Sequence, residues 1–259
     1  MVEPAFSADG SKLAFASIRQ GGEWTIFVAG PDGSSPSPIT SEGQSARVIS
    51  WIGSDSIAYL GERQGRRDFW ITSLHGPPKR VELKLDLGPY AIVRPSPQGN
   101  RVVAHSGDRN IGIKLVLIDM ATGESRDLTP RGRTFVFPSW SPDGRWISAV
   151  ERIDPDTDRR VVIDASTGTI QTLVDAPDEP AFFHSNWAPD NDRIVYASRQ
   201  DGVFNIYWAS RTTGQVQQLT HFTSQSATTS QPVWSPRGDQ IVFQHADSIA
   251  NIYVGELRF

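Results

Sequence analysis

The chain of 259 residues contains no cysteine, which excludes disulfide bonds, thiolate catalysis and zinc sites with cysteine ligands. This absence fits a periplasmic and a cytoplasmic bacterial protein equally well. Histidine is also scarce, and its five copies show none of the paired spacings that metal ligands need. They are His75, His105, His184, His221 and His245. We therefore expect neither a metal site nor a cofactor.

No apolar run is long enough to span a membrane. The first strand-like residues are not preceded by a signal peptide, in which a basic segment is followed by an apolar one. The formal net charge is −4, and the basic residues are spread along the chain apart from three close pairs. These pairs are Arg66/Arg67, Arg131/Arg133 and Arg159/Arg160. A nucleic-acid binder needs a concentrated basic face, so we expect neither a nucleic-acid partner nor membrane insertion. Helix-period stretches are lacking too, and we expect almost no helix.

What the chain does contain is an internal repeat, in which an anchor residue precedes a turn of the type Ser-Pro-Asp-Gly. The anchors are Phe6, Trp51, Pro95, Trp140, Trp187 and Trp234. Their successive spacings are 45, 44, 45, 47 and 47 residues. In the turn, Pro fixes its own φ, Asp accepts local hydrogen bonds and Gly takes a positive φ. A large anchor side chain can fill the space between neighbouring repeats.

Each repeat then has the pattern of a four-stranded propeller blade. A β-rich run follows the turn, as at Lys12–Ala16 and Trp146–Val150, and a second apolar run follows a polar loop. A fourth strand ends at pairs such as Ile39-Thr40, Leu128-Thr129, Leu173-Val174 and Leu219-Thr220. We predict an all-β, six-bladed propeller with antiparallel blades, forming one domain over residues 1–259. The approximate repeats are 3–44, 45–87, 88–132, 133–178, 179–226 and 227–259.

The last repeat has residues for three strands only, since Asn251–Gly255 is followed by the end of the chain at Phe259. Three alternatives stay open. Blade six keeps three strands, residues 257–259 add a stub, or the chain was cut from a longer polypeptide. An exposed edge strand would invite pairing with another chain.

Three short sequences carry a family resemblance: Trp140–Ile147, the Asn-Ile-Tyr runs at 205–207 and 251–253, and Gln218–Thr220. They resemble the WD40-like (PD40) repeat of TolB-type propellers, over essentially the whole chain. The small α/β domain that precedes the TolB propeller is absent. The same repeat is similar to blades of prolyl-oligopeptidase-type peptidases and of oligogalacturonate lyases. The resemblance implies the fold and a location in the periplasm or cell envelope of a bacterium, with the cytoplasm as the open alternative.

The sequence offers no catalytic constellation. No Gly-x-Ser-x-Gly nucleophile elbow is present, and a hydrolase domain is missing. The acidic run Asp154–Asp158 has the alternation of a calcium loop, but Arg159 and Ala165 stand where Gly and Glu are needed. We interpret it as a polar hairpin tip.

Candidate binding residues come from the innermost strands, which would line the channel of a propeller. Alternation along a strand directs every second side chain toward the channel, and the polarity of these side chains differs between repeats. The position three before the anchor is polar in repeats one, five and six and apolar in repeats two to four. The candidates are Glu3, Arg47, Arg94, His184 and Gln231.

We expect a non-catalytic propeller that binds a protein or peptide at the channel mouth, although a small-molecule ligand is an alternative. One other hypothesis is a carbohydrate-active or sugar-binding propeller similar to oligogalacturonate lyases. Such a lyase needs a metal with several histidine ligands, and His184 is the only histidine expected on an inner strand. Another is the gating propeller of a larger peptidase or sensor.

Overall fold

The computed structural model describes residues 2–18, 22–40, 45–85, 91–108, 112–154, 157–176, 184–246 and 250–256. Over these residues the chain is all-β, with 23 strands and no helix, as expected. The strands form five four-stranded sheets and one three-stranded sheet. No helix among the described residues has the length and apolarity to cross a membrane.

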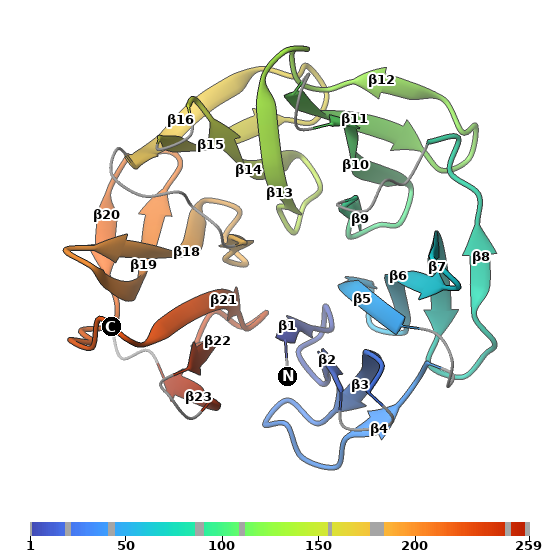
Figure 1. The fold of residues 1–259 in the computed structure, drawn as a ribbon, viewed down its shortest axis with the longest axis horizontal. Coiled ribbons are helices and arrows are strands. Elements are labelled where there is room, and N and C mark those ends of the chain that lie inside the picture. The colour runs from blue at the N-terminus through green and yellow to red at the C-terminus, as the bar shows by residue number, and fades with distance from the viewer. Residues whose placement is uncertain are drawn as a thin grey trace. The chain divides into compact units, whose positions relative to one another are not determined.

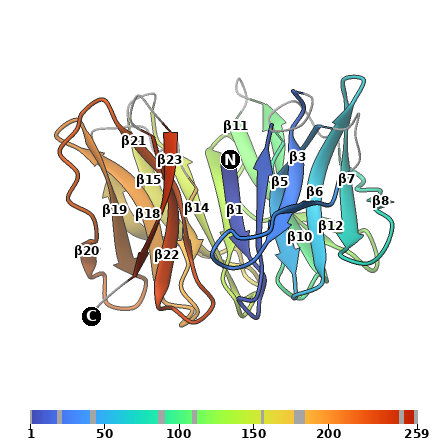
Figure 2. The same ribbon diagram turned by 90° about the horizontal axis from the view of Figure 1, so that it is seen from below.

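The chain forms two compact units, which are Met1–Ser106 with Leu117–Arg126, and Gly107–Val116 with Asp127–Phe259. We call them unit 1 and unit 2. Unit 1 holds two complete sheets (Figure 1): β1 (Val2–Phe6), β2 (Leu13–Ser17), β3 (Thr25–Ala29) and β4 (Ser37–Pro38), then β5 (Ser45–Ile52), β6 (Ser56–Arg63), β7 (Arg66–Ser73) and β8 (Lys79–Val81). In unit 1, β1, β5, β6 and β7 run along nearly one axis (Figure 2).

The residues of the third sheet are divided between the two units: β9 (Val93–Pro95), β10 (Arg101–Asp108), β11 (Gly112–Asp119) and β12 (Ser125–Asp127). Unit 2 holds three further sheets: β13 (Thr134–Trp140), β14 (Trp146–Arg152), β15 (Asp158–Asp164) and β16 (Ile170–Ala176), then β17 (Asn186–Trp187), β18 (Arg193–Gln200), β19 (Val203–Ser210) and β20 (Val216–Gln218), then β21 (Thr228–Trp234), β22 (Gln240–Ala246) and β23 (Ala250–Glu256). Strands consecutive in the chain are neighbours within every sheet. Each sheet is therefore an antiparallel meander, as in a propeller blade.

The predicted strands after each turn are confirmed, and most extend further than expected. The expected run Trp146–Val150 is the start of β14, which continues to Arg152. The added residues lie at the end away from the turn, where polar residues such as Arg152 hid the strand pattern. Pairing with the neighbouring strand decides the strand's length there.

The Ile-Thr and Leu-Thr pairs expected to end the fourth strands instead lie just beyond them in three sheets. Thr40, Thr129 and Thr220 each accept a hydrogen bond at Oγ1 from a backbone N–H of the third strand. The donors are Ile26, Leu115 and Ile206, at 3.0, 2.8 and 2.9 Å. The repeated threonine thus replaces a backbone acceptor where pairing with the outer strand ends. The fourth expected pair, Leu173-Val174, has valine in place of threonine, and both of its residues lie inside β16.

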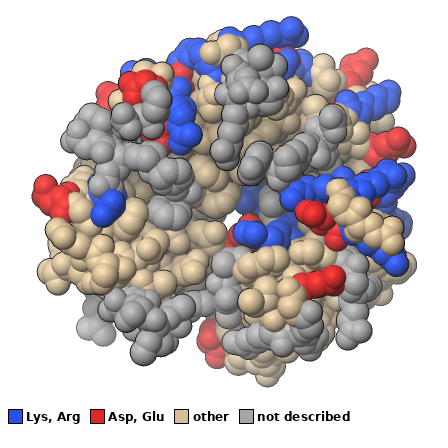
Figure 3. Space-filling model, viewed as in Figure 1, with Lys and Arg blue, Asp and Glu red and all other residues tan. Residues whose placement is uncertain are grey.

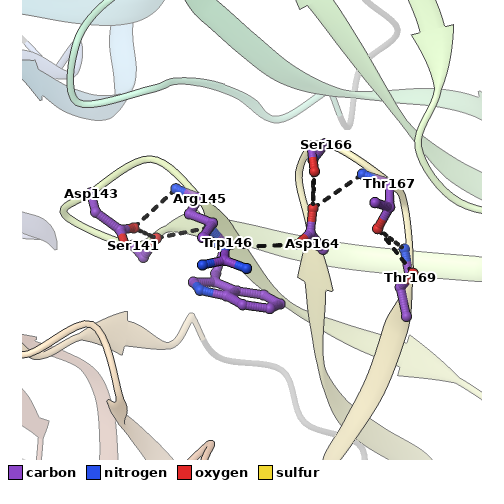
Figure 4. A network of polar contacts seen from close by, with 8 residues as sticks. All are labelled: Ser141, Asp143, Arg145, Trp146, Asp164, Ser166, Thr167 and Thr169. Atoms are coloured by element: carbon purple, nitrogen blue, oxygen red, sulfur yellow. Dashed lines mark hydrogen bonds and ion pairs between the residues drawn. The ribbon is translucent and has the colours of Figure 1, made fainter.

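The Ser-Pro-Asp-Gly turn is held by its own polar side chains (Figure 4). The buried Ser141 accepts a hydrogen bond of 2.9 Å from the backbone N–H of Trp146, and its Oγ lies 2.5 Å from the Asp143 carboxylate. Asp143 also accepts the N–H of Arg145, and Gly144 has a φ of +71°. The same serine contact to the residue five positions on occurs at Ser7, Ser96 and Ser235. The turn chemistry predicted from the repeat is confirmed.

Three of the anchor tryptophans, Trp51, Trp187 and Trp234, pack between neighbouring sheets of the same unit. Trp51 packs in a core cluster with Ile26 and Tyr59 from the first two sheets. Trp234 packs with Ala188 and Trp208 from the preceding sheet. The four anchor tryptophans are at most 9% exposed. Each sheet therefore hides an apolar face that it could not bury by itself.

The last sheet has three strands in the order β21-β22-β23. This matches the sequence expectation that the last repeat supplies only three strands. Leu257, Arg258 and Phe259, which could have formed a further stub, lie outside the described residues.

Candidate functional site

In four of the six sheets the first strand is interrupted by a β-bulge. In β1, β5, β13 and β21 the register shifts by one residue within the strand. Glu3, Phe137 and Gln231 occupy these bulges with φ of 55°, 55° and 53°. All three stand at the position three before the anchor. A positive φ is uncommon for such residues and stores strain.

This bulge corrects the assumption of simple alternation along the innermost strands. At a bulge two residues oppose one on the partner strand, so the side-chain directions beyond it no longer follow a period of two. The sequence signal was the proline that follows each of these residues, at Pro4, Pro138 and Pro232. Proline has no N–H for the ladder and is found in sheets at bulges and edges.

Unit 1 brings three of the five predicted site residues together. Strands β1, β5 and β9 are neighbours in Figure 1, and contacts join β1 to β5 and β5 to β9. The Arg47 guanidinium on β5 lies 3.6 Å from the Glu3 carboxylate on β1. The Glu3 carboxylate also acts electrostatically on Arg94, on β9. We call Glu3, Arg47 and Arg94 the first-strand cluster.

Arg94 is held by the strand beside it. Its Nη1 donates a hydrogen bond of 2.6 Å to the carbonyl oxygen of Ile49 and another of 3.2 Å to Ser50 Oγ. Burial lowers the pKa of Arg94 from its ordinary value, and the charge of Glu3 partly offsets this. Repeat three has Pro95 as its anchor, so it has no tryptophan indole N–H to donate to the preceding sheet. Arg94, next to Pro95, supplies a donor to that sheet instead. Part of its role is therefore structural.

Arg47 is the accessible member of the first-strand cluster. Its side chain is 47% exposed, whereas that of Glu3 is 9% exposed. The Arg47 guanidinium lies 4.7 Å from the centre of the Trp24 ring, which positions it without covering it. One carboxylate and two guanidinium groups leave the cluster with a net charge of about +1. Such a cluster can bind a carboxylate or another anion at its accessible side.

His184 and Gln231 belong to unit 2. His184 was expected on an inner strand, but it lies two residues before β17, which begins at Asn186. Its ring contacts Phe137 edge to face, with 4.9 Å between ring centroids. Gln231 lies in the bulge of β21. Both residues therefore lie at or beside the first strands of unit 2.

Sequence reasoning missed a group of buried charges in unit 2. Asp158 and Arg160 are 1% and 3% exposed, and Arg152 lies 3.1 Å from Asp158. The Arg160 guanidinium donates to the carbonyl oxygen of Ala197 and lies over the Tyr196 ring. Burial lowers the pKa of Arg160 to about 10 and raises that of Tyr196 to about 12. These charged residues are covered by the next sheet, and the local sequence does not indicate that packing.

No group of three or more His, Asp or Glu side chains placed to hold a metal ion occurs among the described residues. The acidic run at 154–158 is divided, because Asp154 is exposed and Asp158 is a buried strand residue paired with Arg152. Pro155 and Asp156 lie outside the described residues.

Comparison with solved structures gives the same fold at low identity. TolB from Acinetobacter baumannii matches with a TM-score of 0.71 and 21% identity, over 83% of this chain and 53% of that one. A protein assigned to TolB from Agrobacterium tumefaciens matches with a TM-score of 0.69 and 18% identity, over 99% and 90%. An oligogalacturonate lyase in complex with manganese matches with a TM-score of 0.64 and 15% identity, over 99% and 88%. This chain thus spans about half of the first protein, and identities this low show the fold alone.

Comparison with curated proteins found no match. The family model of the TolB beta propeller domain, PD40, matches residues 94–258, which is more than half of the chain. The match begins at Arg94 and includes the turns and anchors at Trp140, Trp187 and Trp234. Together with the antiparallel meander sheets, it shows that this chain is a β-propeller that belongs to the TolB β-propeller domain family.

Proposed function

We propose that this propeller is a non-catalytic binding module that holds a segment of another polypeptide against its first strands. The observation that carries the proposal is the first-strand cluster, where the accessible Arg47 lies 3.6 Å from the largely buried Glu3. The cluster has an excess of positive charge, so the complementary group on the partner is a carboxylate. Rigid sheets place these side chains without the need to order a loop on binding.

We further infer that the repeats close into one six-bladed ring over residues 1–259, with the first strands around a central channel. The nearly constant spacing of 44 to 47 residues and the family membership support this arrangement. In such a ring Glu3, Arg47, Arg94, His184 and Gln231 would share one channel mouth. A location in the cell envelope, which the resemblance to TolB-type repeats implies, is part of the same proposal.

The proposal is tested by capturing partners from an extract of the source cells on three immobilised proteins. These are the unmodified chain, Arg47→Gln and the control Arg145→Gln. Arg145 is a close match for Arg47, because it is 66% exposed, lies 4.9 Å from the centre of the Trp146 ring and lies 3.9 Å from an aspartate. It differs in lying outside the first strands.

We expect a polypeptide that the unmodified chain and Arg145→Gln retain and that Arg47→Gln loses. A synthetic peptide from its acidic segment should then bind Arg47→Gln about tenfold more weakly in fluorescence anisotropy, which is the loss of about one charge-assisted contact. Equal retention by all three proteins, or no direct binding of the peptide, would overturn the proposal.

A further inference from the structure

A concave site lies in unit 1, on strands β7 and β8, and shares no residue with the first-strand cluster. It is a cavity of about 450 Å³, within the range of about 300–1,000 Å³ that holds small molecules. Its lining residues are Gly65, Arg66, Arg67, Asp68, Phe69, Arg80, Val81, Glu82, Leu83 and Leu85. We call this cavity the edge pocket.

Two arginines of the edge pocket share a single carboxylate oxygen. Arg66 Nη2 lies 3.4 Å and Arg80 Nη1 3.3 Å from Asp68 Oδ1. Their side chains are 70% and 43% exposed, so most of their donors face solvent or the pocket. A guanidinium group has five N–H donors, and one shared oxygen engages few of them. The pocket therefore offers two guanidinium groups with unused donors.

The strand pairing explains why these side chains converge. On β7 and β8, Trp70 lies opposite Arg80 and Phe69 opposite Val81. Asp68 and Trp70 share a face of β7, since side chains two apart point the same way. Arg80 is therefore brought beside Asp68 by the register of the sheet, and it reaches the carboxylate that Arg66 contacts from the first position of β7.

The segment around the edge pocket is basic although the whole chain is acidic. Residues 62–84 contain six Lys and Arg and three Asp and Glu, whereas the formal net charge of the chain is −4. Basic side chains gather over this side of unit 1 in Figure 3. The positive charge is local, and it would attract an anion to this surface specifically.

The pocket also has an apolar part. Phe69 is buried, and Val81, Leu83 and Leu85 are half-buried beside the arginines. Apolar side chains next to paired guanidinium groups suit a ligand with a carbon skeleton as well as a negative charge.

We propose that the edge pocket is a binding site for a small organic anion that carries a carboxylate or phosphate group. Arg66 and Arg80 bind the anionic group, for which the planar guanidinium fork is well shaped, and Val81, Leu83 and Leu85 contact the carbon skeleton. The site is independent of the polypeptide-binding function proposed above, because it shares no residue with the first-strand cluster.

The test uses the full chain labelled with ¹⁵N. Citrate and inorganic phosphate are titrated into it separately, and the amide chemical shifts are measured at each concentration. The variant is Arg66→Gln with Arg80→Gln. The matched control is Arg131→Gln with Arg237→Gln, which removes two arginines that are 82% and 78% exposed, each paired with one aspartate outside the pocket. Both doubles remove two positive charges at exposed positions, so the fold should be unaffected.

We expect saturable shifts at Gly65–Phe69 and Arg80–Leu85 with at least one probe. The dissociation constant should rise by about tenfold or more in the pocket variant and stay unchanged in the control. Saturation by citrate alone identifies a carboxylate ligand, and saturation by phosphate alone a phosphorylated one. Shifts that do not saturate with either probe, or equal weakening in both doubles, would overturn the proposal.

Discussion

The indole Nε1 of Trp187 donates a hydrogen bond of 3.0 Å to the carbonyl oxygen of Ser139, 48 residues earlier in the chain. In unit 1, Trp51 makes the equivalent bond of 2.9 Å to Ala5, 46 residues earlier. Both acceptors stand immediately before the anchor of the preceding sheet. These two anchor tryptophans thus join adjacent sheets by a specific polar contact as well as by burial, whereas the buried Trp234 has no hydrogen-bond partner for its Nε1 among the described residues.

Replacing the anchor indole should therefore cost more than the loss of its area. We expect Trp187→Phe to lower the free energy of unfolding by about 1–3 kcal/mol more than Trp208→Phe, because it removes the indole donor of the Ser139 carbonyl and leaves that oxygen only the longer bond of 3.4 Å from Ser148 Oγ. Trp208 is a suitable control, since it is also buried and its Nε1 has no hydrogen-bond partner within the described part of the chain. Urea denaturation of the two variants measures the difference, and equal midpoints would contradict the prediction.

The two arginines of the first-strand cluster should respond differently to substitution. Arg94→Gln removes donors to the carbonyl oxygen of Ile49 and to Ser50 Oγ, so it should destabilise the protein by about 1–3 kcal/mol. Arg47→Gln breaks an ion pair that is half open to water and should change stability by less than about 1 kcal/mol. Chemical denaturation of both variants tests this. A stable Arg94→Gln protein would show that Arg94 is not needed to hold β9 beside β5.

A third prediction concerns the backbone at Gln231, which has a positive φ. At a φ of 53°, a β-branched side chain is strained and glycine is not. We expect Gln231→Val to be less stable than Gln231→Gly by about 1–2 kcal/mol, although valine is normally the better strand residue. Both variants lose the same side-chain contacts of Gln231, so their difference reports the backbone. Thermal denaturation that ranks valine above glycine would refute the bulge at this residue.

Stability should fall in acid partly through Asp164. The hydroxyl of Ser166 and the backbone N–H groups of Ser166 and Thr167 donate to its carboxylate, and these bonds hold the pKa of Asp164 below its ordinary value of 3.8 (Figure 4). Below pH 3.8 the unfolded chain then binds the proton more readily than the folded chain, so acid favours unfolding. The contribution is fully present above pH 3.8 and is lost as the pH falls through the folded pKa.

Asp164→Asn keeps the acceptor oxygen but removes the titration. Urea midpoints measured from pH 6 to pH 2.5 should therefore decline less steeply for this variant than for the unmodified chain below about pH 4. The same decline in both proteins would show that Asp164 contributes nothing to the acid sensitivity.

Much of the fold could be predicted from local chemistry. Ser141-Pro142-Asp143-Gly144 forms the turn that its residue types dictate, because the hydrogen bonds of Ser141 Oγ and of the Asp143 carboxylate that close it reach no further than Trp146. The spacing of Trp51, Trp140, Trp187 and Trp234 likewise predicted one buried side chain per sheet. The candidate site was predicted in part, since Glu3, Arg47 and Arg94 do converge in unit 1.

Other features depend on residues far apart in the chain. Nothing next to Thr40 in the sequence indicates that its hydroxyl accepts the N–H of Ile26, 14 residues earlier. The burial of Asp158 and Arg160 depends on the neighbouring sheet, which contributes Tyr196 and the carbonyl of Ala197. Arg66 and Arg67 looked like one of several basic pairs, and only the β7–β8 register shows that Arg80 joins them.

The sequence by itself determined the repeat, its turns and its four-stranded pattern, because these depend on contacts within about 45 residues and on residue-specific φ values. The tertiary structure decided which polar side chains are buried, where the bulges turn Glu3, Phe137 and Gln231, and which arginines meet a shared carboxylate. Those outcomes depend on the register between strands and on the packing of one sheet against the next, and a one-residue shift in either would reverse them.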